Sequence, residues 1–115
     1  LERDNVVYTG THDANPLRGW YETEASQNQR RRLNRYLGRK LTADTVAPAL
    51  IQLAMMTVAD TVIIPLQDVL GLGADARMNR PGTMKGNWIW RCREDQFVPG
   101  TAAKLAGWAE LYGRT

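Results

Sequence analysis

Two short β-branched runs, far apart in the chain, constrain the fold more than any other feature. Residues 6–9 (VVYT) stop at Gly10, and residues 61–64 (TVII) stop at Pro65, which cannot donate to a central ladder. The second run has no alternation of polar and apolar residues, so it predicts a buried strand. Because helix-forming sequence separates the two runs, we expect a parallel crossover with a helix packed on the sheet.

Three segments have the pattern of helices. Residues 22–37 carry acidic residues first and basic residues last, as a helix dipole favours, and Gly38 is the expected stop. A second helix is expected after Thr42 or Asp44 as cap, and its apolar body must be covered on more than one side. The third helix is expected over residues 101–112.

The remaining stretches predict loops. Residues 11–19 and 71–86 are rich in glycine, proline or asparagine and are expected to be irregular. Residues 87–91 (NWIWR) are expected to be short and extended, which would direct Trp88 and Trp90 to opposite sides.

Two strands joined by one crossover are too few for a stable sheet, and the apolar second helix lacks a partner in the sequence. The chain also opens at Leu1, without an initiator methionine, almost directly on a strand. We therefore expect a segment of a longer protein whose N-terminal part is missing, and a removed tag or initiator is the alternative explanation of Leu1. Its open sheet edges and uncovered helix face should drive self-association.

Composition and charge argue against several classes of protein. The net charge of +3 supports neither a nucleic-acid partner nor a membrane partner. The most apolar stretch, residues 46–59, is shorter than the roughly 20 residues that a membrane span needs. A lone cysteine, Cys92, fits a reducing compartment, and His12 is the one histidine, so no metal site is expected.

Three further patterns were weighed for function. Residues 71–76 (GLGADA) match a dinucleotide fingerprint, but Pro81 interrupts any long helix after them, so no nucleotide site is expected. Arg31, Arg35 and Arg39 share one helix face, which favours a solvated surface over RNA binding. The pair His12–Asp13 follows the first strand, where α/β folds place ligands, although a loop aspartate that caps a turn is the alternative.

Four segments occur in one order: YTGTHD (8–13), GWYE (19–22), IIPLQDVLGLGADARMNRPGT (63–83) and GNWIWR (86–91). Together they resemble the C-terminal end of the 4-α-glucanotransferase family, also called amylomaltase or disproportionating enzyme. The resemblance implies an α/β, helix-rich partial (β/α)8 TIM barrel, in which residues 1–115 form the last two strand–helix units of an incomplete domain. It also implies a cytoplasmic enzyme that acts on α-1,4-glucans (maltodextrins) by a retaining double displacement without a cofactor.

The resemblance assigns roles to three residues. Asp13 matches the family's third catalytic carboxylate, which stabilises the transition state through sugar hydroxyls. His12 matches its sugar-binding neighbour, and Asn79 matches a loop residue that lines the active-site face. Residues 14–17 (ANPL) depart from the polar sequence that follows this triplet in many members. Nothing in the chain matches the nucleophile or the general acid/base, so the chain alone is expected to be inactive.

Two other classes of function stay open from the residues alone. A free-standing carbohydrate-binding module would use Trp20, Trp88 or Trp90 as stacking platforms, because aromatic rings suit sugar faces. An RNA-binding protein would use the arginine run, and its affinity would fall steeply with salt. Tryptophan fluorescence with maltoheptaose and the salt dependence of RNA binding distinguish them from a glucanotransferase segment.

Overall fold

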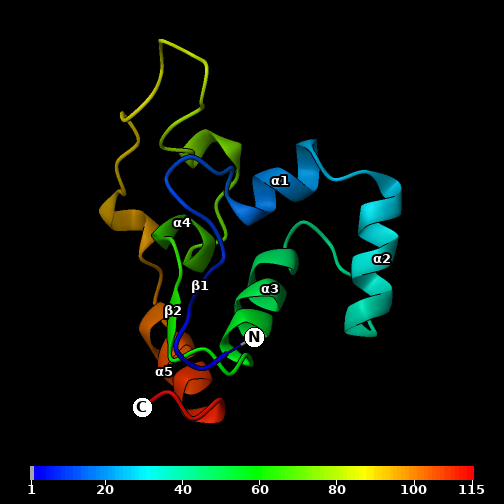
Figure 1. Ribbon diagram of the computed structural model, residues 1–115. Coiled ribbons are helices and arrows are strands. Elements are labelled where there is room, and N and C mark those ends of the chain that lie inside the picture. The colour runs from blue at the N-terminus through cyan, green and yellow to red at the C-terminus, as the bar shows by residue number, and fades with distance from the viewer. Residues whose placement is uncertain (1) are drawn as a thin grey trace.

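Two three-residue strands, β1 (Val6–Tyr8) and β2 (Thr61–Ile63), lie side by side and parallel, as the crossover predicts (Figure 1). The computed structural model describes residues 2–115. The helices are α1 (Leu17–Thr23), α2 (Gln27–Leu37), α3 (Val46–Met55), α4 (Leu66–Val69) and α5 (Thr101–Leu111), with 3-10 turns at Ala74–Ala76 and Glu94–Gln96. The chain is therefore a helix-rich α/β structure.

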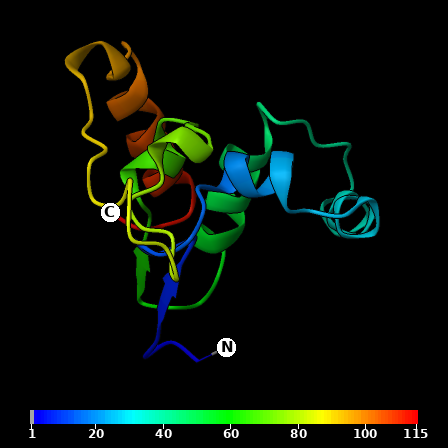
Figure 2. The same ribbon diagram turned by 90° about the horizontal axis from the view of Figure 1, so that it is seen from above.

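The expectation that the second strand is buried is wrong. Val62 is half-buried, but Thr61 is exposed and Ile63 is 45% exposed. In Figure 2, α3 and α5 lie on one side of the two strands, and within residues 2–115 no helix covers the other side. An all-apolar strand of this kind needs cover on both faces, and the described residues supply it on one.

The core is built around α3. Val46 and Ile51 are fully buried, and Ala49 is nearly so. This helix contacts α1, α4 and α5, which confirms that its apolar surface is covered on more than one side. The expectation that this surface lacks a partner within the chain is wrong, because these three helices supply the cover. Beside it, Tyr21 of α1 packs into the same cluster and donates its hydroxyl to the carbonyl of Leu41 at 3.1 Å.

The single helix expected over residues 22–37 is two helices, because a capping box starts a new one. The Ser26 hydroxyl accepts from the Gln29 backbone N–H at 3.1 Å, and the Gln29 side chain accepts from the Ser26 N–H at 2.9 Å. This reciprocal pair satisfies two free donors at the start of α2. The stop at Gly38 is confirmed, since its φ of 71° is left-handed.

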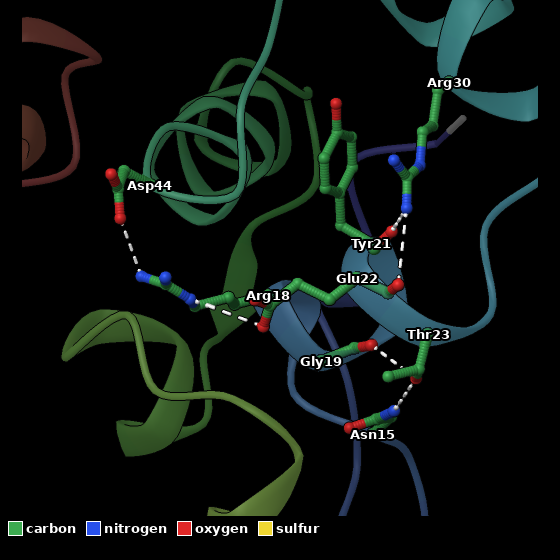
Figure 3. A network of polar contacts seen from close by, with 8 residues as sticks. All are labelled: Asn15, Arg18, Gly19, Tyr21, Glu22, Thr23, Arg30 and Asp44. Atoms are coloured by element: carbon green, nitrogen blue, oxygen red, sulfur yellow. Dashed lines mark hydrogen bonds and ion pairs between the residues drawn. The ribbon is translucent and has the colours of Figure 1, made fainter. Parts of the chain in front are cut away.

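Two further boundaries differ from expectation. Residues 17–19, expected in a loop, belong to α1. Neither Thr42 nor Asp44 caps α3: the residue before the helix is Thr45, and Asp44 instead accepts from the Arg18 guanidinium at 2.7 Å (Figure 3). A residue that can cap a helix takes another partner when tertiary structure offers a charged one.

The C-terminal helix α5 begins at the predicted residue and ends one residue before the predicted end. Four residues at helical spacing are half-buried: Leu105, Trp108, Ala109 and Tyr112. Tyr112 donates its hydroxyl to the Gln52 side chain of α3 at 3.0 Å. Within the described residues, no helix is both long and apolar enough to cross a membrane.

Arg114 holds the end of α3, and its loss is expected to destabilise the fold. Its guanidinium donates to the carbonyls of Met55, Thr57 and Ala59 at 2.8–2.9 Å. We expect Arg114→Ala to lower the free energy of unfolding by about 2 kcal/mol, because hydrogen bonds from a charged donor are strong and these three join the end of α3 to the segment after it. Arg114→Lys should recover little, since an ammonium cannot span the same carbonyls.

Urea unfolding of the two variants measures this effect. Arg31→Ala, on the exposed face of α2, is the matched control and should change stability by less than about 0.5 kcal/mol. Equal stability of the Arg114 and Arg31 variants would contradict the role assigned to Arg114.

Candidate active site

Three chain segments meet beyond the carboxyl end of β1. The loop after β1 carries His12 and Asp13, and the irregular segment after α4 carries Arg77 and Asn79. The loop that carries Trp88 folds back onto both. In Figure 1 these segments gather at the end of the strands opposite the N-terminus. The position agrees with the rule that α/β folds place ligands past the carboxyl ends of their strands.

The carboxylate of Asp13 is the centre of this cluster. The Asn79 side-chain amide donates to Asp13 Oδ1 at 2.6 Å, and His12 Nε2 lies 3.3 Å from the same oxygen. The side chains of His12 and Asp13 are 59% and 46% exposed, so solvent and ligands can reach both. The structure thus brings together the three residues that the resemblance singles out.

Arg77 fastens the two segments to each other through their backbones. Its Nη2 donates to the Asp13 carbonyl at 2.7 Å, and its Nε donates to the Asn79 carbonyl at 3.0 Å. The Asn79 N–H also donates to the His12 carbonyl at 3.1 Å. The Arg77 side chain is 16% exposed and pairs with Glu24 at 3.8 Å. Planar guanidinium donors with fixed directions suit such a double attachment.

Trp88 has an unusual backbone and lies beside His12. Its φ is +62°, the one positive φ among non-glycine residues in the described part of the chain. The extended conformation expected for residues 87–91 is therefore wrong at Trp88. The Trp88 N–H donates to the Met78 carbonyl, and its ring centre lies 5.2 Å from that of His12. Left-handed backbone in a bulky residue is costly and is concentrated at functional sites.

Asp68 lies beneath the loop that carries Asp13. This carboxylate is 2% exposed, and it accepts from the Thr9 hydroxyl at 2.9 Å and from the Leu17 N–H at 2.8 Å. Burial raises the pKa of the Asp68 carboxyl above its ordinary value, while the hydrogen bonds from Leu17 and Thr9 oppose that rise. A cavity of about 500 Å³ adjoins it and is lined by both Asp68 and His12.

The other patterns weighed in the sequence lie away from this cluster. Residues 71–76 end in the short 3-10 turn Ala74–Ala76 and open no long helix, which supports rejection of the dinucleotide motif. Arg31, Arg35 and Arg39 are all exposed, as a solvated surface requires. Arg39 does not share their helix face as expected, because α2 ends at Leu37 and Gly38 turns the chain. Trp20 packs against the core beside α2.

The remaining aspartates do not join Asp13. Asp60 precedes β2, at the opposite end of the strands, and lies 3.7 Å from Arg3. Asp75 is exposed in a 3-10 turn. Residues 2–115 contain no cluster of three or more histidine, cysteine, aspartate or glutamate side chains that could hold a metal ion. The cluster around Asp13 contains one oriented, accessible carboxylate, and an amide, an imidazole and an aromatic ring surround it. This set of groups suits hydrogen bonding to a polyhydroxylated ligand.

Reasoning from the sequence missed Arg77 and Asp68 as parts of this region, and it considered Trp88 only as a stacking platform of a carbohydrate-binding module. Arg77 stands two residues before Asn79 in the motif RMNRPG, so proximity to a site residue is the one signal that could have marked it. The contacts of Asp68 join residues 51 and 59 positions apart. No local pattern encodes contacts of that range.

Known proteins match the chain along its length. A 4-alpha-glucanotransferase of Aquifex aeolicus is 47% identical over 119 residues, covering 99% of this chain and 23% of that protein. A 4-alpha-glucanotransferase of Synechocystis is 46% identical over 109 residues, covering 95% of this chain and 21% of that protein. The chain thus spans about a fifth of the length of these relatives.

A solved structure shares the fold. The amylomaltase from Streptococcus agalactiae in complex with acarbose superposes with a TM-score of 0.90 and is 32% identical, over 99% of this chain and 23% of that one. The family model described as 4-alpha-glucanotransferase matches residues 1–96, a range that contains every residue of the cluster around Asp13. On these matches, the chain belongs to the 4-alpha-glucanotransferase family.

Proposed function

We propose that this chain supplies the part of the active site that contains Asp13 in a retaining 4-α-glucanotransferase. Such an enzyme transfers α-1,4-glucan segments between maltodextrins. The observation that carries the proposal is the 2.6 Å hydrogen bond from Asn79 to Asp13, with His12 beside the same carboxylate oxygen. These three side chains form one accessible cluster, as a sugar subsite requires. Membership of the family adds the reaction class.

The proposed architecture is a (β/α)8 barrel in which β1 and β2 are neighbouring strands. Residues 1–115 then form an incomplete catalytic domain, and other strands cover the surfaces that β1 and β2 leave open. Val6, Tyr8 and Ile63 are 45–53% exposed, which is unusual for strand residues of these types. A barrel needs about 250 residues, and its catalytic groups lie at the carboxyl ends of its strands, where Asp13 stands.

Asp13 would act on the sugar that is being transferred. Among residues 2–115, none donates a hydrogen bond to Asp13 Oδ2, so this oxygen can accept from a ring hydroxyl. Such hydrogen bonds strengthen as the ring becomes oxocarbenium-like, which lowers the barrier rather than the ground-state energy. His12 would bind the same sugar, and Asn79 would hold the carboxylate in place.

The covalent step needs two further carboxyl groups about 5–5.5 Å apart, one as nucleophile and one as general acid/base. We propose that both come from residues outside this chain. The partners of the chain are then the rest of the same enzyme and the glucan. The lone Cys92 fits a reducing compartment such as the cytoplasm, although the relative from Solanum tuberosum is named chloroplastic/amyloplastic.

A segment exchange tests the proposal. The matching segment of the Aquifex aeolicus enzyme, 47% identical, is replaced by this chain, and the product is named here the exchanged enzyme. We expect it to convert maltotriose into shorter and longer glucans, whereas the 115-residue chain alone makes no product at the same concentration. An exchanged enzyme that folds but transfers nothing, or transfer by the chain alone, would contradict the proposal.

A free-standing carbohydrate-binding module is not favoured, because the relatives are enzymes of which the chain covers about a fifth. Titration of the chain with maltoheptaose, followed by tryptophan fluorescence, separates the two functions. We expect little or no change, because one wall of an active site offers few of the contacts that hold a sugar. Saturable tight binding by the chain alone would favour the module.

A further inference from the structure

Asp68 is the one charged residue that is buried in the described part of the chain, and neither the core nor the proposed reaction accounts for it. It stands in α4, three residues after the proline that ends β2. Within residues 2–115, no cationic group lies within 4.0 Å of its carboxylate. A buried carboxylate without a cation destabilises a fold unless hydrogen bonds replace its hydration. The partners in the hydrogen bonds of Asp68 indicate the role of this carboxylate.

Both carboxylate oxygens bind the ends of one loop. Oδ2 accepts from the hydroxyl of Thr9, the residue just before the loop 10–16. Oδ1 accepts from the N–H of Leu17, the first residue of α1 and the first residue after the loop. Gly10 passes so close to the carboxylate that a Cβ there would lie 3.8 Å from Oδ2.

We propose that Asp68 is the positioning residue for Asp13: its carboxylate joins Thr9 to Leu17, and so fixes both ends of the loop that presents Asp13. The inference rests on the proposed function only for what Asp13 does, and not for how it is held. Asp13 stands at the middle of the loop 10–16, as far from one fixed end as from the other. Its backbone carbonyl is held separately by Arg77.

The chemistry of the two partners determines which substitutions keep both attachments. The Leu17 N–H can only donate, so it needs an acceptor, whereas the Thr9 hydroxyl donates here but can also accept. Asparagine keeps one acceptor for the Leu17 N–H, and its amide can donate to the Thr9 hydroxyl oxygen. Asp68→Asn should therefore preserve both attachments. Alanine removes both attachments.

The first test measures amide hydrogen exchange over residues 10–17 of this segment within the folded exchanged enzyme. We expect Asp68→Ala to speed hydrogen exchange of the Leu17 amide and of the loop at least about tenfold, beyond any change in global stability. Asp68→Asn should stay within about threefold of the unsubstituted enzyme. Arg114→Ala is the control, because it weakens the fold at the end of α3. After correction for the loss of global stability, its hydrogen-exchange rates in the loop should equal those without the substitution.

The second test measures kinetics in the exchanged enzyme with maltotriose. A carboxylate displaced by about 1 Å can lower turnover about a hundredfold, so Asp68→Ala should reduce kcat by about 10- to 100-fold with KM little changed. Asp68→Asn should restore kcat, and Arg114→Ala should leave kcat per folded enzyme unchanged.

The two readouts separate the inference from the proposed function. An exchanged enzyme that is inactive without any Asp68 substitution contradicts the proposed function, and the hydrogen-exchange result still decides whether Asp68 holds the loop. Equal rates of amide hydrogen exchange in the loop 10–16 of Asp68→Ala and Arg114→Ala would overturn the inference. A kcat for Asp68→Ala equal to that of the unsubstituted enzyme would overturn it as well.

Discussion

Replacement of Asp13 by asparagine in the exchanged enzyme is expected to lower kcat for glucan transfer by about a thousandfold, with a much smaller change in KM. Asparagine has nearly the same shape, and it can still contact Asn79, but it carries no negative charge to stabilise an oxocarbenium-like sugar. Loss of one electrostatic contact that forms fully only in the transition state lowers turnover about 10²–10³-fold. Initial rates with maltotriose measure the effect.

The matched control is Asp75→Asn, which makes the same chemical change at an exposed position in the 3-10 turn Ala74–Ala76. It should leave kcat and KM within about twofold of the unsubstituted enzyme, as is usual for surface positions. Transfer by Asp13→Asn at the rate of Asp75→Asn would remove Asp13 from the proposed mechanism.

The second large effect is on stability, at Gly19 in α1. An added Cβ would lie 2.2 Å from the Asn15 side-chain oxygen and 2.7 Å from the Ala74 backbone nitrogen. Figure 3 shows the Thr23 hydroxyl donating to the Gly19 carbonyl at 2.7 Å and accepting from the Asn15 side chain at 3.4 Å. Because Ala74 offers backbone rather than a flexible side chain, α1 itself must move. We expect Gly19→Ala to lower the free energy of unfolding by about 3 kcal/mol.

Gly107 in α5 provides the control, because nothing lies within 4 Å of a Cβ built there. Gly107→Ala should stabilise the chain by about 0.5–1 kcal/mol, since alanine is the better helix former. Urea unfolding of the two variants should therefore give shifts of opposite sign. A neutral Gly19→Ala would show that α1 and the turn at Ala74 are not in the close contact described.

The parts of the fold that the sequence predicts are those set by local chemistry. β-branched runs that stop at Gly10 and Pro65 place the two strands, and the distance between them in the chain makes their pairing parallel. Gly38 ends α2 because it readily adopts a left-handed conformation. The position of His12 and Asp13 past the end of a strand follows from the same boundary.

The parts that it does not predict depend on competition between distant groups. The break between α1 and α2 has a local signal, Ser26 with Gln29, but the helix formers on both sides mask it. Asp44 is a good capping residue that pairs with Arg18 instead. The exposure of Ile63 depends on how many elements the described chain supplies, and not on the residue itself.

The candidate site divides in the same way. Resemblance identifies Asp13, His12 and Asn79 by residue type and order. Their mutual geometry depends on Arg77 and Asp68, whose contacts with residues 9–17 span 51 to 64 positions. The backbone of Trp88 is likewise fixed by a bond to Met78, ten positions earlier. Motif residues can be read along the chain, but the side chains that hold them in place are found through the fold.

A crystal structure of the exchanged enzyme with acarbose, the compound bound in the Streptococcus agalactiae amylomaltase, tests most directly the claim that Asp13 faces the transferred sugar. We predict a carboxylate oxygen of Asp13 at about 2.7 Å from a ring hydroxyl of the inhibitor, with Asn79 still bound to the other oxygen. Acarbose bound in the active site with Asp13 beyond hydrogen-bonding reach of every sugar ring would contradict the claim.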